Sequence, residues 1–262
     1  MEWLQAVILG LIQGLTEFIP ISSSGHLIIA QTFMSGAADH LFLEFINFGT
    51  LLALLVFFRH RIWTILVDIF EHRNYRLARN IIITSIPAGI IGLASAKFIE
   101  SHAFFGSLIT VAVALFVVGV VMIIVEKLPR AAEVKDGEHL SWVRALIIGL
   151  AQTVALIPGV SRSGATILSA RFVGLKPAQA AEYSFLASIP VMLGVTAKTF
   201  ISDHAYLSAN LPTLALSNLI AFISGMIAIG FLMKYLQRHS LAIFGWYRVA
   251  LALILVIVLL VQ

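Results

Sequence analysis

Two stretches of this sequence repeat one pattern: residues 10–26 read GLIQGLTEFIPISSSGH and residues 149–164 read GLAQTVALIPGVSRSG. Each begins Gly-Leu-x-Gln, continues through apolar residues to Ile-Pro, and ends in Ser-x-Ser-Gly. Gln13 corresponds to Gln152 and Gly25 to Gly164, both 139 positions apart, with one residue inserted after Pro158. Proline breaks a helix, and the small polar residues after it favour a turn. The pattern therefore predicts two apolar helices that each break and turn back.

The composition places the chain in a membrane. It is 60% hydrophobic and only 11% charged, whereas soluble chains carry roughly 25% charged residues. The absence of cysteine excludes a disulfide framework and a thiolate metal site. The net charge of +4 is better interpreted through its distribution over loops than as a nucleic-acid signal. We therefore expect membrane lipid, and no nucleic acid, as a partner.

Six stretches are long and apolar enough to cross a bilayer, which takes about 20 residues. The two repeated stretches are too short and too broken for this, so we interpret each as a re-entrant hairpin. The predicted fold is an all-α polytopic membrane protein with two hairpins, at 3–20 with 27–34 and at 145–158 with 164–174. The predicted spans are 41–58, 80–98 (with a kink at Pro87 and Gly89), 101–125, about 178–199, 212–233 and 243–261.

The two halves are predicted to form an inverted repeat. Each half has three spans, an odd number, so the second half must enter the membrane from the opposite side. We predict one integral membrane domain with a first repeat at 1–130, a charged cytoplasmic linker at 131–144 and a second repeat at 145–262. Paired broken helices in the two halves of a membrane protein indicate a site at the repeat interface.

Loop charges predict the orientation. Thirteen of the 17 Lys and Arg residues fall on one side of this topology: five in 59–79, four in 127–144, and two each in 171–176 and 234–238. The opposite loops, 35–40 and 202–211, contain Asp39 and Asp203 but no Lys or Arg. The basic side of a membrane protein faces the cytoplasm. Both termini and the mouth of the first hairpin are then extracytoplasmic.

The first hairpin carries an unusual set of polar residues for an apolar segment. An ionisable side chain at mid-bilayer costs about 3 kcal/mol on insertion scales, so Glu17 requires an explanation. Glu17 could be a helix-end carboxylate near the interface, but hydroxyl groups and an imidazole follow it directly, which favours a functional role. Gln13 lies four residues before Glu17 and shares its helix face. The following polar residues are Ser22, Ser23, Ser24 and His26.

The second hairpin carries the features of an anion site. Hydroxyls, glycines with exposed amides, a helix N-terminus and the Arg162 guanidinium all favour phosphate. A purely structural alternative is that Arg162 pairs with Glu17 and joins the two tips. The predicted phosphate-binding residues from both hairpins are Ser22, Ser24, Ser161, Ser163, Gly164 and Thr166.

The residues predicted to support the site are Gln13, Gln152 and Glu182. Gln152 matches Gln13. Glu44 and Glu182 follow the two Ser-Gly turns at similar distances, where each could pair with a tip or lie at the interface. Arg248, after Trp246-Tyr247, is interpreted as an interface anchor or structural partner.

If the tips meet, they combine a base, a nucleophile and an anion clamp, which is the set that phosphoryl transfer needs. A pocket inside a bilayer indicates a substrate with a lipid tail. A divalent cation held by Glu17 and substrate phosphates would complete the charge balance. Ser23 is the favoured nucleophile, with Glu17 or His26 taking its proton. His26 as the direct phosphoryl acceptor stays open.

These motifs resemble those of the undecaprenyl-diphosphate phosphatase family of the bacitracin-resistance type, over essentially the whole chain. The resemblance implies hydrolysis of undecaprenyl diphosphate to undecaprenyl phosphate at the bacterial inner membrane, which recycles the lipid carrier for peptidoglycan synthesis. It also implies dependence on Mg2+ or Ca2+. It places Glu17, Ser23, His26 and Arg162 in the family's catalytic positions. Gln13 stands where many members have glutamate and cannot be a charged metal ligand, which leaves Glu17.

Two alternatives follow from the same features. Inverted repeats with broken helices are also a transporter architecture, so a transporter or flippase of a lipid phosphate is the main rival. An acid-phosphatase-like lipid phosphatase would need a histidine downstream of its Ser-Arg element, and residues 163–173 contain none. The sequence leaves open lipid chain length and oligomeric state, a homodimer included.

Overall fold

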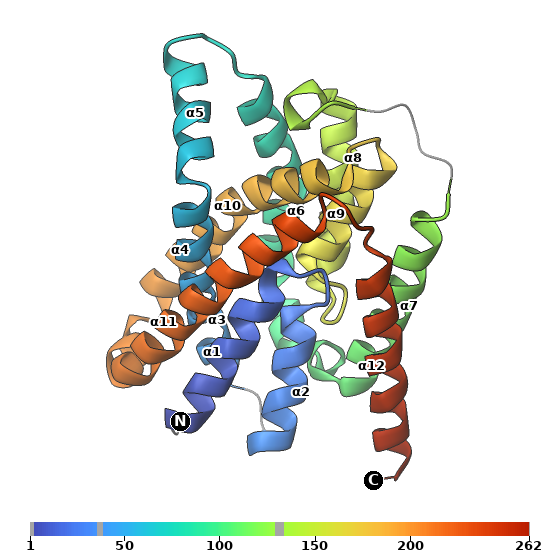
Figure 1. Cartoon of the computed structure of the whole chain (residues 1–262). Helices are drawn as coiled ribbons and strands as arrows, with labels where there is room; N and C mark the ends of the chain where they lie inside the picture. Colours follow the sequence, from blue (N-terminus) through green and yellow to red (C-terminus); the bar gives the residue numbers. More distant parts are fainter. Residues whose placement is uncertain (1–2, 36–38, 129–133, 262) are drawn as a thin grey trace.

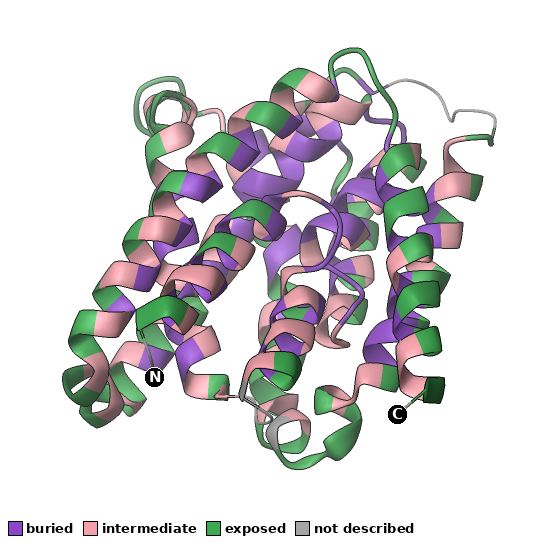
Figure 2. Ribbon diagram, turned by 60° about the horizontal axis from the view of Figure 1, so that its bottom comes forward, coloured by how far each residue is buried: buried purple, intermediate pink, exposed green. Residues whose placement is uncertain are grey.

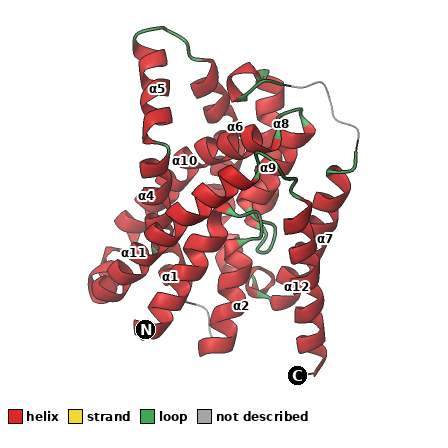
Figure 3. Cartoon of the chain, viewed as in Figure 1, coloured by secondary structure: helices red, strands yellow, loops and turns green. Residues whose placement is uncertain are grey.

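The fold is helical throughout the parts of the chain that this computed structural model describes, residues 3–35, 39–128 and 134–261 (Figures 1 and 3). A single β-bridge, between Val134 and Leu175, is the other regular feature within these ranges. The helices of the first half are α1 (Trp3–Phe18), α2 (Ser23–Ser35), α3 (His40–Phe45), α4 (Asn47–Phe57), α5 (Arg59–Phe70), α6 (Arg76–Ser101), η1 (Ala103–Gly106) and α7 (Leu108–Val125). Those of the second half are η2 (Gly137–His139), α8 (Trp142–Thr153), η3 (Val154–Leu156), α9 (Arg162–Phe172), α10 (Pro177–Ser202), α11 (His204–Tyr235) and α12 (Ala242–Val261).

Six segments of the described chain are long and apolar enough to cross a membrane, which confirms the predicted number of spans. They are α3 with α4, α6, α7, α10, α11 and α12. Their outward faces carry exposed apolar side chains such as Ile90, Phe116, Ile227 and Ile257. Figure 2 shows the buried residues toward the centre and the exposed ones on the outer faces of the helices. Such outer faces suit a hydrocarbon environment rather than water.

Two helix pairs, α1–α2 and α8–α9, form the hairpins that the sequence repeat predicts. They enter the molecule from opposite ends, and their tips meet near its centre (Figure 1). The α1–α2 hairpin opens toward the end that holds both chain termini, and the α8–α9 hairpin opens toward the end with α5 and η2. That these hairpins are re-entrant stays a prediction. So does the division of the chain into two repeats and a linker, at 1–130, 131–144 and 145–262, and the boundary at 130 lies outside the described residues.

Each hairpin packs through a glycine at the start of its motif. Gly10 of α1 lies so close to α11 that a Cβ there would come within 2.6 Å of the Ser217 carbonyl oxygen. Gly149 of α8 lies equally close to α6, with 2.6 Å to the Thr84 carbonyl oxygen. Small residues let membrane helices approach in this way. The two glycines are repeat equivalents, so both hairpins are held against a long span at the same point.

Four features differ from the predictions. The loop predicted at 59–79 contains helix α5, whose Trp63, Leu66 and Phe70 follow helical spacing despite the charged residues around them. Residues 204–211, predicted as loop, belong to α11, which continues through Pro212. The second limb of the first hairpin begins at Ser23 rather than 27. The predicted first span is divided at Ile46 into α3 and α4.

Candidate active site

The two hairpin tips have the same local structure. Ser22 has φ 78° and Ser161 has φ 76°, a backbone region that non-glycine residues rarely adopt. The Ser22 hydroxyl accepts a hydrogen bond from the Gly25 amide at 3.3 Å, and the Ser161 hydroxyl accepts one from the Gly164 amide at 3.0 Å. Each serine thus caps the helix that follows it. Backbone strain of this kind is typical of functional sites, and here it reverses the chain directly before the polar residues.

Arg248 of α12 holds both tips together. Its side chain is fully buried. The guanidinium donates to the Pro20 carbonyl in the first tip at 3.0 Å, and to the Gly159 and Val160 carbonyls in the second at 2.5 and 2.9 Å. The planar fork of an arginine suits such a fixed set of acceptors. Arg248 is therefore the structural partner that the sequence analysis considered, and it fixes the distance between the tips.

Glu17 lies at the centre of the polar cluster that the tips form. The Ser23 hydroxyl donates to its Oε2 atom at 2.5 Å. On the other side, Arg162 Nη2 forms an ion pair with Oε1, so the carboxylate bridges a residue of each hairpin. The side chains of Arg162 and Glu17 remain 21% and 9% exposed. The structure therefore contains both the hydroxyl–carboxylate pair that the functional interpretation needs and the ion pair that the structural alternative describes.

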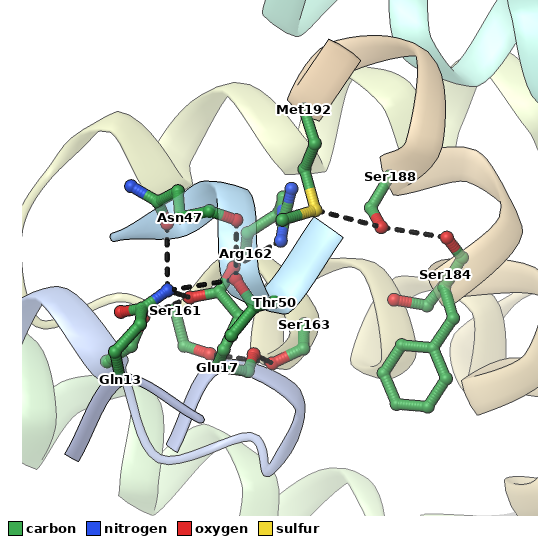
Figure 4. Close-up of polar contacts among 12 residues, drawn as sticks. Gln13, Glu17, Asn47, Thr50, Ser161, Arg162, Ser163, Ser184, Ser188 and Met192 are labelled. Carbon is green, nitrogen blue, oxygen red and sulfur yellow. Dashed lines mark hydrogen bonds and ion pairs between the residues drawn. The ribbon is translucent and has the colours of Figure 1, made fainter. Parts of the chain in front are cut away.

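Gln13 holds this carboxylate in position from one turn below (Figure 4). Its Nε2 atom lies 3.2 Å from Glu17 Oε2, 2.8 Å from Asn47 Oδ1 and 3.2 Å from Thr50 Oγ1. Sequence reasoning missed Asn47 and Thr50 as members of the site. Both are polar residues inside an apolar span, three positions apart and so on one helix face, and this signal could have identified them.

A cavity of about 220 Å3, which we call the tip cavity, opens beside this cluster. Its polar lining comes from Glu17, Ser23, Ser24, Asn47, Ser161 and Arg162, and α10 supplies an apolar wall. The tip cavity shares Ser23, Ser24 and Asn47 with a second cavity of about 480 Å3, the vestibule, which is also lined by Ser101, His102 and Gly106. The vestibule thus leads to the end of the molecule that holds the chain termini.

His26 faces away from Glu17, toward α12. Its Nδ1 atom lies 2.7 Å from the Ser22 carbonyl oxygen, so this nitrogen must carry the proton. Nε2 is then an acceptor, and the Tyr247 hydroxyl donates to it at 2.8 Å. The two rings are stacked, with centroids 5.7 Å apart. No hydrogen bond in the described part of the chain joins His26 to Ser23 or Glu17, although the sequence places all three close together.

The predicted phosphate-binding residues separate into two groups. Ser24 and Ser161 line the tip cavity. The others have structural contacts instead: Ser22 is fully buried, the Gly164 amide is capped, and Ser163 donates to the Glu17 carbonyl at 3.2 Å. Thr166 hydrogen-bonds Ser184 and the Arg162 carbonyl. The polar groups of this second group are therefore used to fold the tips rather than to line the tip cavity.

Three different environments surround Glu182, Glu44 and Gln152. Glu182 pairs with Arg61 at 3.0 Å and not with a residue of either tip. Of the two options for Glu182, this favours a position at the membrane interface. Glu44 accepts a hydrogen bond from Thr199 at 2.9 Å and lines the vestibule. Gln152 is buried, and neither atom of its amide has a partner among the described residues.

The donors around Glu17 fit a hard divalent cation. The side-chain oxygens of Glu17, Ser23 and Asn47 line one cavity, and Mg2+ and Ca2+ prefer oxygen ligands, with substrate phosphates completing the shell. Within the described ranges no group of three His, Asp or Glu residues gathers that could hold a metal by itself. A cation here would therefore depend on phosphate oxygens as well as on protein ligands.

Comparisons with known proteins agree over nearly the whole chain. Residues 6–254 match the family model described as bacitracin resistance protein BacA. A relative named undecaprenyl-diphosphatase from Ectopseudomonas mendocina is 39% identical, covering 96% of this chain and 92% of its own length. Undecaprenyl-diphosphatase 2 of Paramagnetospirillum magneticum is 35% identical over 99% and 100% of the two chains. Undecaprenyl-diphosphatase 1 of Clostridioides difficile is 37% identical over 97% and 95%.

Proposed function

The chain belongs to the bacitracin resistance protein BacA family, and from this premise we propose that it hydrolyses undecaprenyl diphosphate to undecaprenyl phosphate and phosphate. It is a multi-pass membrane protein and a hydrolase, and this activity recycles the lipid carrier of peptidoglycan synthesis and confers resistance to bacitracin. None of the three relatives carries the name of a transporter, so the transporter alternative has no support among them.

One observation carries the chemistry: a serine hydroxyl lies 2.5 Å from a carboxylate that also pairs with an arginine, beside a cavity among apolar helices. A hydroxyl becomes a nucleophile when a base takes its proton. Here Ser23 Oγ attacks the terminal phosphorus of the diphosphate while its proton passes to Glu17 Oε2. The bond from that phosphorus to the bridging oxygen breaks, and undecaprenyl phosphate leaves with the electron pair.

Water then hydrolyses the phosphoserine. The water oxygen bonds to phosphorus, the bond from phosphorus to Ser23 Oγ breaks, and Glu17 returns to Oγ the proton that it took in the first step. The water oxygen and its hydrogens leave with the released phosphate. Arg162 exchanges Glu17 for the oxygens of the transferring phosphoryl group, because a dianionic phosphate competes well for a guanidinium. Fixed positive charge at those oxygens is what phosphoryl transfer requires. Direct attack by His26 is the rival assignment, although Nε2 is occupied by Tyr247.

A divalent cation, Mg2+ or Ca2+, is part of this proposal. Glu17 and the side-chain oxygen of Asn47 would hold it, and it would neutralise charge on the diphosphate. Gln13 is neutral and instead orients the carboxylate.

The proposed location is the bacterial inner membrane, with the tip cavity open to the extracytoplasmic side. Two observations support this. The vestibule leads to the end of the molecule opposite the basic loops, and basic loops mark the cytoplasmic side. Membrane lipid would cover the exposed apolar faces, which are also the surface through which two copies would form a homodimer.

Phosphate release by the purified protein tests the proposal. In detergent with undecaprenyl diphosphate and Mg2+, and without any gradient, we expect phosphate release that stops on addition of a chelator. Glu17→Gln should release little or none while it elutes and melts like the wild type. A well-folded wild-type protein that releases no phosphate under any divalent cation would contradict the proposed function.

A further inference from the structure

A third cavity adjoins the tip cavity and also shares Glu44 and Ile99 with the vestibule. It has a volume of about 500 Å3 and lies between α6, the α8–η3 segment and α10; we call it the α6–α10 cavity. Ala155, Arg162, Val191 and Val195 line both this cavity and the tip cavity, so the two share a wall that includes the arginine. Most of the remaining lining is aliphatic, for example Ile82, Ile86 and Leu156. Its other polar members are Glu44, Ser85, Gln152 and Lys198.

Glycines keep this cavity wide. Gly89 on α6 and Gly194 on α10 line it, and a Cβ added at either position would meet no atom within 4 Å. A Cβ at Gly92 would meet Leu156 only at 3.5 Å. None of these three glycines is therefore required for helix packing, unlike Gly10 and Gly149. What they provide is an open, apolar space that extends along two helices.

Gln152 is one of the polar residues at this wall. It is 2% exposed, it lines the α6–α10 cavity, and neither its Nε2 nor its Oε1 has a partner among the described residues. A buried polar group without a hydrogen-bond partner destabilises the folded protein. Its repeat equivalent Gln13 contacts three acceptors. A polar ligand that enters this cavity would supply the partner that Gln152 lacks.

A lipid diphosphate matches both the polar Gln152 side chain and the aliphatic wall of the cavity, because it carries phosphate oxygens and a hydrocarbon chain. We propose that the α6–α10 cavity is the subsite for the leaving group: Gln152 Nε2 donates to an oxygen of the lipid-linked phosphate, and the first isoprene units lie against Gly89, Gly92 and Gly194. This rests on the proposed function, which puts the terminal phosphate beside Ser23 in the tip cavity. Arg162, at the shared wall, lies between the two phosphates. As the anhydride bond breaks, negative charge grows on the lipid-linked phosphate, and a fixed donor there stabilises it.

Substitution of Gln152 tests the phosphate contact. We expect Gln152→Leu to lower kcat/KM for undecaprenyl diphosphate by about 10- to 100-fold, the range for a lost hydrogen bond to a charged group. Its melting temperature should stay the same or rise, because the free protein loses an unsatisfied amide. The matched variant Gln13→Leu should melt earlier, since it breaks three contacts. A Gln152→Leu protein that melts early, or one that is stable with wild-type kcat/KM, would overturn the assignment.

Filling the cavity tests the hydrocarbon contact. Gly194→Leu should raise KM for undecaprenyl diphosphate at least tenfold and leave inhibition by orthovanadate, a small phosphate mimic that needs only the tip cavity, unchanged. Gly230→Leu on α11 is the control, because a Cβ there meets only Phe57, at 3.7 Å. If a bilayer phospholipid fills the cavity instead of substrate, Gly194→Leu will leave KM unchanged, which contradicts the proposal. A wild type without phosphatase activity would refute the proposed function, whereas an active wild type with unaffected variants would refute only this subsite.

Discussion

Glu17 and Arg162 form an ion pair between two hairpins that enter the molecule from opposite ends. The pair has two physical interpretations. It can hold the tips together, or it can be the resting state of a site in which substrate phosphate displaces the carboxylate. Both residues line the tip cavity, and Arg248 already joins the tips by hydrogen bonds to three carbonyls. The ion pair is therefore not needed as a connection, which favours the second interpretation.

Arg162→Lys should lose most of its kcat, about 10³-fold or more, even though the net charge is kept. Lysine presents one compact charge on a flexible stem and cannot grip two phosphate oxygens. Thermal stability in detergent should change little. Phosphate release and a melting curve on the same sample measure both quantities.

The structural interpretation predicts a different pattern for the same variant. An Arg162→Lys protein would unfold early, and Glu17→Gln would partly rescue it by removing an unpaired buried carboxylate. Near-normal turnover in a well-folded Arg162→Lys protein would contradict both interpretations and would mean that phosphate binds elsewhere.

Ser23→Ala should abolish turnover, while His26→Gln should leave measurable activity. The reason is geometric: the Ser23 hydroxyl already donates to a carboxylate, whereas both nitrogens of His26 are engaged with Ser22 and Tyr247. Phosphate release is the measurement. Full activity of Ser23→Ala would remove the serine from the mechanism, and an acid-labile, base-stable phosphoenzyme would assign the nucleophile to His26.

Tyr247→Phe should reduce kcat roughly fivefold with little change in KM. The variant removes one hydrogen bond to His26, worth about 1 kcal/mol, and the imidazole ring is then held less firmly in its orientation. The stacked ring is retained, so stability should hold. A double-mutant cycle is the sharp readout: Tyr247→Phe should have no further effect in a His26→Gln background. Additive losses would mean that Tyr247 acts independently of the imidazole.

Arg248→Leu should destabilise the protein by about 3 kcal/mol or more, since it leaves carbonyls of both tips without a donor. The melting temperature in detergent measures this. Arg238→Leu, at an exposed position, is the matched control and should change stability by no more than about 0.5 kcal/mol. Equal melting temperatures for the two variants would show that the tips do not depend on Arg248.

Impermeant thiol labelling of intact cells should modify Ala103→Cys but not Gln237→Cys. Ala103 lines the vestibule at the predicted extracytoplasmic end, and Gln237 is exposed beside the basic residues at the other. Ala37 and Ala132, the natural choices in the two flanking loops, lie outside the described residues. The chain contains no cysteine, so the background is clean. Labelling of position 237 alone would contradict the predicted orientation and show that the opposite end of the molecule faces outward.

Much of the architecture could be predicted because hydrophobic length and the internal repeat are strong signals. The six spans follow from apolar stretches, and Pro20 and Pro158 locate the two tips. Helix α5 was missed because its apolar residues are interspersed with Arg59, His60 and Arg61, so that composition indicated a loop. Spacing at Trp63, Leu66 and Phe70 contained the better signal.

The membership of the site was harder to predict, because sequence proximity does not determine which way a helix face points. Ser23 and His26 are three residues apart, yet one hydrogen-bonds Glu17 and the other Tyr247. Asn47 and Thr50 come from a different span: their polarity within an apolar helix marks them as candidates, but the sequence does not show that their partner is Gln13. The equivalence of Ser22 and Ser161 predicted that the tips are alike but not that these serines serve as helix caps.

The position of Arg248 in the chain has a consequence for biogenesis. A ribosome adds residues from the N-terminus, so both hairpin tips are synthesised before the guanidinium that joins them. Until α12 inserts, the carbonyls of Pro20, Gly159 and Val160 lack that donor, and the two tips are joined only by direct contacts such as the Glu17–Arg162 ion pair. The contacts that position Ser23, Glu17 and Arg162 are therefore complete only after α12 has been synthesised and inserted.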